Sequence, residues 1–81
     1  IRFKTMRDAI TASDAEKLYR AAHSLKSASA SLGAINLSGL ARQLEHMGRN
    51  EDLEDVRDNF NEAVREYGVV RHALKKYIPA R

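Results

Sequence analysis

The chain has 81 residues, of which 14 are Lys or Arg and 11 are Asp or Glu, so its net charge is +3. A chain of this length forms at most one small domain and has no room for a large internal active-site cavity. It contains no cysteine, which excludes disulfides and thiolate metal sites and is typical of a cytoplasmic protein. No stretch reaches the ~20 apolar residues of a membrane span.

Residues 1–12 form the first predicted helix, because Phe3, Met6 and Ile10 recur at the spacing of one helix face. No capping residue precedes them. We therefore expect residues 1–81 to be a single domain excised from a longer polypeptide and missing part of its N-terminal helix.

A second helix is predicted over residues 14–32. Ser13 and Glu16 have the spacing of a capping box at its start, and Gly33 supplies the stop at its end. Its core side is predicted from the four-three spacing of small and apolar residues. These residues are Leu18, Ala22, Leu25, Ser29 and Leu32.

The third predicted helix is capped by Asn36 and ends at Gly48. One apolar face runs along it. This face consists of Leu37, Leu40, Ala41, Leu44 and Met47.

The last predicted helix is the most regular. Its first turn is the acidic block 51–55, which complements the positive end of the helix dipole, and it ends at Pro79. Its heptad seam consists of Leu53, Val56, Phe60, Ala63, Tyr67, Val70, Leu74 and Tyr77. We attribute Gly68, inside this helix, to close helix packing. Short connections between four amphipathic helices predict an all-α, antiparallel up-and-down four-helix bundle.

His23 does not lie on the core side of the second helix. It sits roughly 150° from the centre of that side, on a face that also carries Tyr19, Lys26, Ser27 and Ala30. The sequence therefore predicts an exposed histidine on a platform of small side chains that another protein can reach.

A lone exposed histidine is more often a bystander, but these neighbours favour chemistry. Histidine is the usual side chain for reversible nucleophilic reactions near neutral pH. Phosphoryl transfer requires one ring nitrogen in line, an orienting hydrogen bond on the other, and cations for the phosphate oxygens. Lys26 and Arg20 flank His23 as such cations, and the small Ser27 and Ala30 leave the approach open.

Other chemistries have little support. His46 and His72 lack such surroundings, and no two of the three histidines have the spacing of metal ligands on one helix face. No nucleotide-binding loop and no catalytic triad is present, so the chain should not use ATP. The basic net charge alone suggests nucleic-acid binding, but a dense basic stripe with stacking aromatics is missing.

The run from His23 to Ala34 resembles the signature of histidine-containing phosphotransfer (HPt) domains, and the resemblance extends over roughly residues 10–78. It implies that His23 accepts a phosphoryl group from a receiver-domain aspartate and passes it to another receiver. Lys26 matches the family's lysine that stabilises the phosphate, and Gly33 matches a glycine with a structural role. Ser27 replaces the family's usual glycine.

The resemblance also implies a docking surface. Glu45 stands where a polar residue of the next helix hydrogen-bonds the active histidine in that family, and Arg49 lies near the docking edge. The predicted docking residues are Tyr19, Arg20, Ser27, Ala30, Glu45 and Arg49.

The resemblance further implies a monomeric phosphocarrier whose partners are receiver domains, with no nucleic-acid or membrane contact. The chain should bind no cofactor, and Mg²⁺ should come with the receiver. We expect a cytoplasmic domain, often the C-terminal module of a hybrid sensor histidine kinase. Two alternatives remain: the related domain of chemotaxis kinases, and a helical module that docks receivers without accepting phosphate.

Overall fold

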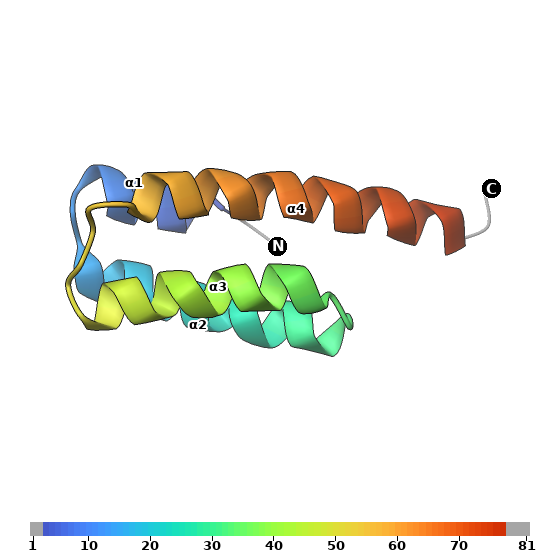
Figure 1. Cartoon of the computed structure of the whole chain (residues 1–81), viewed down its shortest axis with the longest axis horizontal. Helices are drawn as coiled ribbons and strands as arrows, with labels where there is room; N and C mark the ends of the chain where they lie inside the picture. Colours follow the sequence, from blue (N-terminus) through green and yellow to red (C-terminus); the bar gives the residue numbers. More distant parts are fainter. Residues whose placement is uncertain (1–2, 78–81) are drawn as a thin grey trace.

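The computed structural model describes residues 3–77, with side chains over residues 3–75. Within this part of the chain, four helices run alternately up and down: α1 (Lys4–Thr11), α2 (Ala15–Ser31), α3 (Ile35–Arg49) and α4 (Val56–Tyr77). Helices α1 and α4 form one layer, and α2 and α3 form the other (Figure 1). The predicted all-α, antiparallel four-helix bundle is confirmed.

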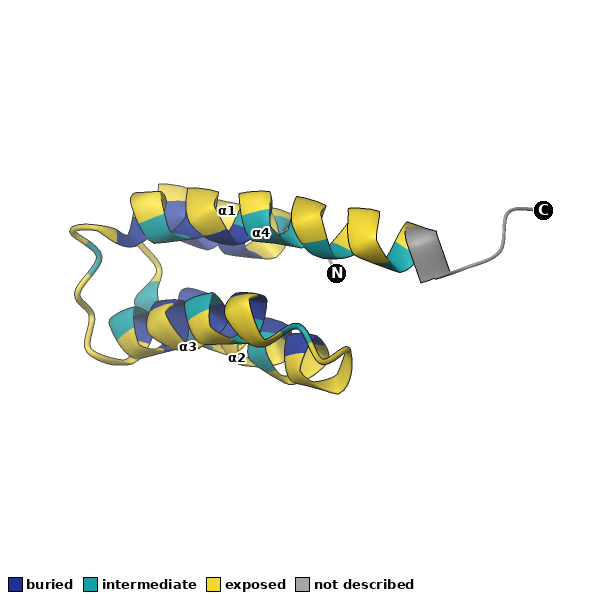
Figure 2. Cartoon of the chain, turned by 45° about the vertical axis from the view of Figure 1, so that its right-hand side comes forward, coloured by how far each residue is buried: buried dark blue, intermediate teal, exposed yellow. Residues whose placement is uncertain are grey.

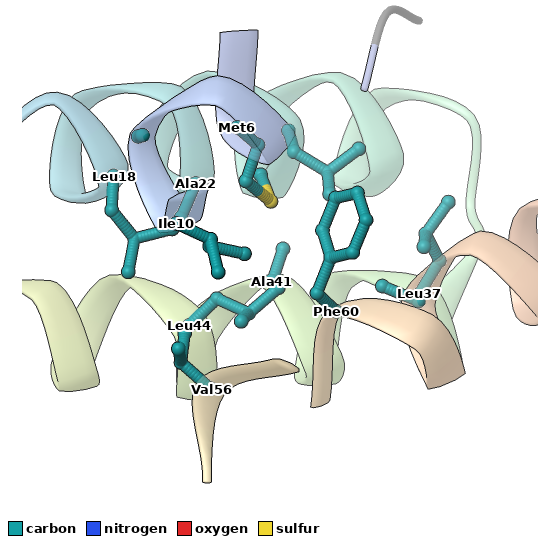
Figure 3. Close-up of a cluster of buried hydrophobic side chains, with 12 residues drawn as sticks. Met6, Ile10, Leu18, Ala22, Leu37, Ala41, Leu44, Val56 and Phe60 are labelled. Carbon is teal, nitrogen blue, oxygen red and sulfur yellow. The ribbon is translucent and has the colours of Figure 1, made fainter. Parts of the chain in front are cut away.

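The core lies between the two layers. Met6 and Ile10 of α1 and Phe60 of α4 point toward the buried faces of α2 and α3 (Figure 3). The buried hydrophobic residues are Met6, Ala9, Ile10, Leu18, Ala22, Leu25, Leu37, Ala41, Leu44, Val56, Phe60 and Ala63. The predicted apolar faces of the first three helices are confirmed except at Leu32, with Phe3, Leu40 and Met47 partly buried and packed against the core. That side chain follows the last residue of α2 and is 49% exposed.

Burial fades along the predicted seam of α4. Val56, Phe60 and Ala63 are buried, whereas Tyr67, Val70 and Leu74 are only partly covered (Figure 2). Helix α1 lies beside the first half of α4, and the end of α4 extends past the turn between α2 and α3 (Figure 1). Leu53 precedes the helix but packs on the core. The side chain of Tyr77 and the predicted stop at Pro79 lie outside the described residues.

The end of α2 forms as predicted. Gly33 has a positive φ of 73°, and the amides of Gly33 and Ala34 donate to the carbonyls of Ala30 and Ser29 at 3.0 and 2.9 Å. This pair of bonds satisfies the last carbonyls of the helix in a Schellman motif. Glycine suits the left-handed position because it has no Cβ.

Ser13 and Glu51 occupy the equivalent left-handed position after α1 and α3, with φ of 54° and 55°. Because Ser13 closes α1, it does not cap α2, and the predicted capping box is wrong. The N-cap is Asp14, whose carboxylate accepts a 3.0 Å hydrogen bond from the amide of Lys17.

Two other predicted boundaries are also wrong. Helix α3 begins at Ile35, so Asn36 lies inside its first turn instead of capping it. The acidic block 51–55 lies in the connection before α4, because the chain must first turn through Glu51 at the end of α3. Asp58 is the acidic residue in the first turn of α4.

The prediction that α3 ends at Gly48 is wrong. Gly48 instead allows α3 to pack close to α2. The helix continues to Arg49, and Gly48 is buried against the α2 backbone. A Cβ at this position would lie 2.8 Å from the backbone nitrogen of Tyr19 and 2.9 Å from the carbonyl oxygen of Ala15. Close packing does not explain Gly68, where a Cβ would have no neighbour within 4 Å.

Candidate phosphotransfer site

His23 lies on the outer face of α2, as predicted. Its neighbours Ala22 and Leu25 are buried in the core, whereas 56% of the His23 side chain is exposed. The one polar residue on the buried face, Ser29, is satisfied locally because its hydroxyl donates to the carbonyl of Leu25 at 2.6 Å. The buried stripe therefore fixes the helix with His23 pointing outward.

Glu45 of α3 lies beneath His23. Its carboxylate binds both of the chemically important α2 side chains: Oε2 lies 2.5 Å from Nδ1 of His23, and Oε1 accepts a hydrogen bond of 2.7 Å from Nζ of Lys26. Only 8% of the Glu45 side chain is exposed, against 33% for Lys26. Glu45 was expected on the docking surface but is buried, and it contacts His23 and Lys26.

The surroundings of Glu45 keep its carboxyl group ionised. The hydrogen bond from Lys26 is the largest cause that lowers the pKa of Glu45, the bond to His23 lowers it further, and burial opposes both. An ionised carboxylate can only accept hydrogen bonds. The hydrogen between the two residues therefore belongs to Nδ1 of His23, and Nε2 is the ring nitrogen that Glu45 does not engage.

Tyr19 and Arg49 form one border of the site. The guanidinium of Arg49 donates to the Tyr19 hydroxyl at 3.0 Å and lies 5.0 Å from the centre of its ring. The Tyr19 ring stacks beside the His23 ring, with centroids 6.3 Å apart. The hydrogen bond to Tyr19 also raises the pKa of Arg49. This border stands where the backbones of α2 and α3 meet at Gly48.

The remaining predicted residues divide into two groups. Ser27 and Ala30 are exposed on the same helix as His23, as the platform requires. Arg20, expected to flank His23 as a cation, is engaged elsewhere, because its guanidinium binds Glu16 at 2.7 Å.

The other histidines lie outside this constellation. His46 shares a 2.9 Å hydrogen bond with Asn50, and His72 is exposed on α4. In the described part of the chain, no group of three His, Cys, Asp or Glu side chains could hold a metal ion.

Arg42 is not among the predicted docking residues. This exposed residue of α3 lines a groove of about 840 Å³ together with Lys26, Glu45, His46 and Arg49. The signal was present in the sequence, since Arg42, His46 and Arg49 recur at the spacing of one helix face.

A helical bundle that holds one outward histidine from behind with a buried acceptor has the architecture of a phosphoryl-carrying module. The chain belongs to the Hpt domain family: the family model, described as "Hpt domain", matches residues 2–78. No curated protein and no solved structure matches the chain at a significant level.

Membership of this family sets the general activity. The chain is a phosphocarrier of two-component phosphorelays, not a catalytic enzyme, and Hpt domains work with receiver domains. None of the described helices is both long and apolar enough to span a membrane.

Proposed function

We propose that His23 is the residue that carries the phosphoryl group, with Nε2 as the acceptor atom. The observation that carries this proposal is the hydrogen bond between Nδ1 of His23 and the ionised carboxylate of Glu45. That bond fixes the tautomer, so the lone pair of Nε2 is available to attack phosphorus without a separate base.

The transfer step follows from this geometry. Nε2 attacks the phosphorus of a receiver aspartyl phosphate, the N–P bond forms as the P–O bond to the aspartate breaks, and the carboxylate leaves with the electron pair. The imidazole keeps its Nδ1 proton and gains a positive charge, which the carboxylate of Glu45 offsets. Attack by the aspartate of a second receiver reverses the step and returns the neutral ring.

Lys26 stabilises the phosphoryl oxygens in this account. Its ammonium group binds Glu45 in the resting state, one turn beyond His23. Because a third of its side chain is exposed, the ammonium can move from the carboxylate toward a phosphoryl group on Nε2. The Mg²⁺ ion that neutralises charge on the phosphate would be supplied by the receiver.

Receivers would dock over the outer face of α2 and the adjoining edge of α3. The small, exposed Ser27 and Ala30 leave room for a partner above His23, while Tyr19 and Arg49 border that space. In this proposal the domain acts as a cytoplasmic monomer, a module of a hybrid sensor kinase, and has no nucleic-acid or membrane role.

A labelling experiment tests the assignment. Receiver domains from a panel are phosphorylated, loaded with Mg²⁺ and incubated with the wild-type chain and with His23→Gln. An acid-labile, base-stable label on the wild type alone is the expected result. A His23→Gln variant that is labelled to the wild-type level would overturn the assignment. No label on the folded wild type would favour a docking module that carries no phosphate.

A further inference from the structure

Beside the phosphotransfer site, α3 presents a row of basic side chains that faces solvent. Arg42, His46 and Arg49 are exposed and lie at i, i+4 and i+7 on the helix. All three line the groove of about 840 Å³ that also reaches Lys26 and Glu45. This basic α3 groove therefore shares Lys26 and Glu45 with the site at His23.

The two arginines of this groove differ from Lys26 and Arg20 in that they form no ion pair with an acidic residue in the described part of the chain. Lys26 is paired with Glu45, and Arg20 with Glu16. Among the described residues Arg42 has no ion pair, and Arg49 bonds the neutral hydroxyl of Tyr19. Apart from Glu45, whose charge Lys26 offsets, Asp52 is the acidic residue that lines the groove. The groove therefore carries positive charge that this chain does not neutralise.

We infer that the basic α3 groove is the electrostatic part of the receiver-docking surface, where Arg42 contacts an acidic side chain at the rim of the receiver, outside its Mg²⁺ site. This inference rests on the proposed function, because it takes His23 as the phosphorylated residue. The anionic phosphoryl donor must approach His23, and the groove adjoins His23 on the α3 side. Complementary charge at such a rim speeds encounter and discriminates among partners. The Ala and Ser platform on α2 alone would give little discrimination.

The test compares Arg42→Glu with Lys75→Glu, which reverses an exposed charge on the far half of α4. Transfer from a phosphorylated receiver is measured at limiting and saturating receiver. We expect Arg42→Glu to raise the KM for the receiver roughly tenfold, while the saturated rate stays within about twofold of wild type. The difference should shrink in roughly 0.5 M salt, where surface charges are screened. Lys75→Glu should behave as wild type.

A small phosphoryl donor separates docking from chemistry. Phosphoramidate transfers its phosphoryl group to Nε2 with loss of ammonia and needs no docking surface. It should label Arg42→Glu as well as wild type, and replacing the contacting receiver acid by lysine should restore the KM of the arginine variant.

Several results would overturn the inference. One is an unchanged KM of Arg42→Glu for the receiver. Another is a rise in the KM of Lys75→Glu as large as that of Arg42→Glu. A third is that phosphoramidate no longer labels Arg42→Glu. Loss of duplex DNA binding by Arg42→Glu with an unchanged receiver KM would assign the groove to nucleic acid instead. In each case a labelled wild type and an unlabelled His23→Gln would leave the proposed function intact. Failure of every donor to label the wild type would remove the proposed function itself.

Discussion

Gly48 of α3 lies directly against the backbone of Tyr19 in α2, so closely that a Cβ on Gly48 would come within 2.8 Å of the Tyr19 nitrogen. Tyr19 is one helical turn before His23, and Gly48 is nearly one turn after Glu45. The contact therefore sets the distance between the two helices at the point where the carboxylate of Glu45 must reach the imidazole. The absence of a side chain at Gly48 therefore couples the packing of α3 on α2 to the orientation of His23.

Replacing Gly48 by alanine should weaken both the fold and the site. The new methyl group meets backbone atoms, which cannot move as a flexible side chain would, so we expect a loss of about 1–3 kcal/mol in the free energy of unfolding. Phosphorylation of His23 should slow as the helices separate. Gly68→Ala is the matched control. Since its Cβ enters open space in a helix, it should gain about 0.5–1 kcal/mol. Denaturant unfolding measures both, and a stable, fully active Gly48→Ala would contradict the account.

Glu45 should contribute to the transfer rate mainly as a hydrogen-bond acceptor for Nδ1 of His23, and its charge should matter less. Glutamine can still accept the Nδ1–H bond through its carbonyl oxygen, so Glu45→Gln should keep most of the transfer rate. Leucine removes the acceptor and leaves Nδ1–H without a partner, so Glu45→Leu should lose about tenfold to hundredfold, the cost of one unsatisfied donor. Single-turnover transfer from a phosphorylated receiver measures these rates, with Glu62→Gln on the exposed face of α4 as control. Equal rates for the leucine variant and the wild type would refute the role.

The lowered pKa of Glu45 makes a prediction about acid stability. Its folded-state pKa lies below the ordinary value of 4.5, so the ionised carboxylate stabilises the fold at every pH above about 4.5. That stabilisation is lost as the pH falls from about 4.5 through the lower folded-state pKa. The free energy of unfolding of the wild type should therefore drop more steeply in this range than that of Glu45→Gln. Parallel curves, measured by denaturant titration between about pH 3 and 6, would show that Glu45 is not stabilised by Lys26 and His23.

Adding bulk at the platform should block partners without touching the chemistry. Ser27 is exposed one turn after His23, and a tyrosine there would collide with any protein seated over the ring. We expect Ser27→Tyr to lose at least about tenfold in transfer from receivers and to keep its labelling by phosphoramidate. Asn61→Tyr, at an exposed position of α4, should transfer normally. Normal transfer to Ser27→Tyr would place the docking surface elsewhere.

Helix content and the orientation of His23 could be predicted from the sequence because both depend on local spacing. Leu18, Ala22 and Leu25 recur on one side of α2, which forces His23 to the other side. The polar partner at Glu45 could be predicted only through the family resemblance. Spacing within one helix says nothing about which residue of the next helix lies beneath it.

The helix ends were harder to predict because they depend on backbone conformations that the residue type does not require. Ser13 and Glu51 adopt left-handed φ values that glycine usually supplies, and each closes a helix. Because serine is a common N-cap residue, Ser13 was predicted to cap α2, and the predicted start of α2 is one residue too early.

Tertiary context also limited two other predictions. The heptad seam of α4 continues through Val70 and Leu74, yet these side chains are only partly buried, because the end of α4 extends past the turn between α2 and α3 (Figure 1). The basic α3 groove was missed although Arg42, His46 and Arg49 share one helix face, because spacing within α3 does not show which residues of α2 lie beside that face. Only the packing of α3 on α2 brings them to one surface.

The central claim is that Nε2 of His23 is the atom that carries the phosphoryl group while Nδ1 stays bonded to Glu45. The most direct test labels the ring nitrogens with ¹⁵N, phosphorylates the wild type with phosphoramidate or a phosphorylated receiver, and identifies the phosphohistidine isomer by NMR. We predict the Nε2 isomer on His23, with Nδ1 still protonated. Phosphate on Nδ1, or on a residue other than His23, would contradict the account.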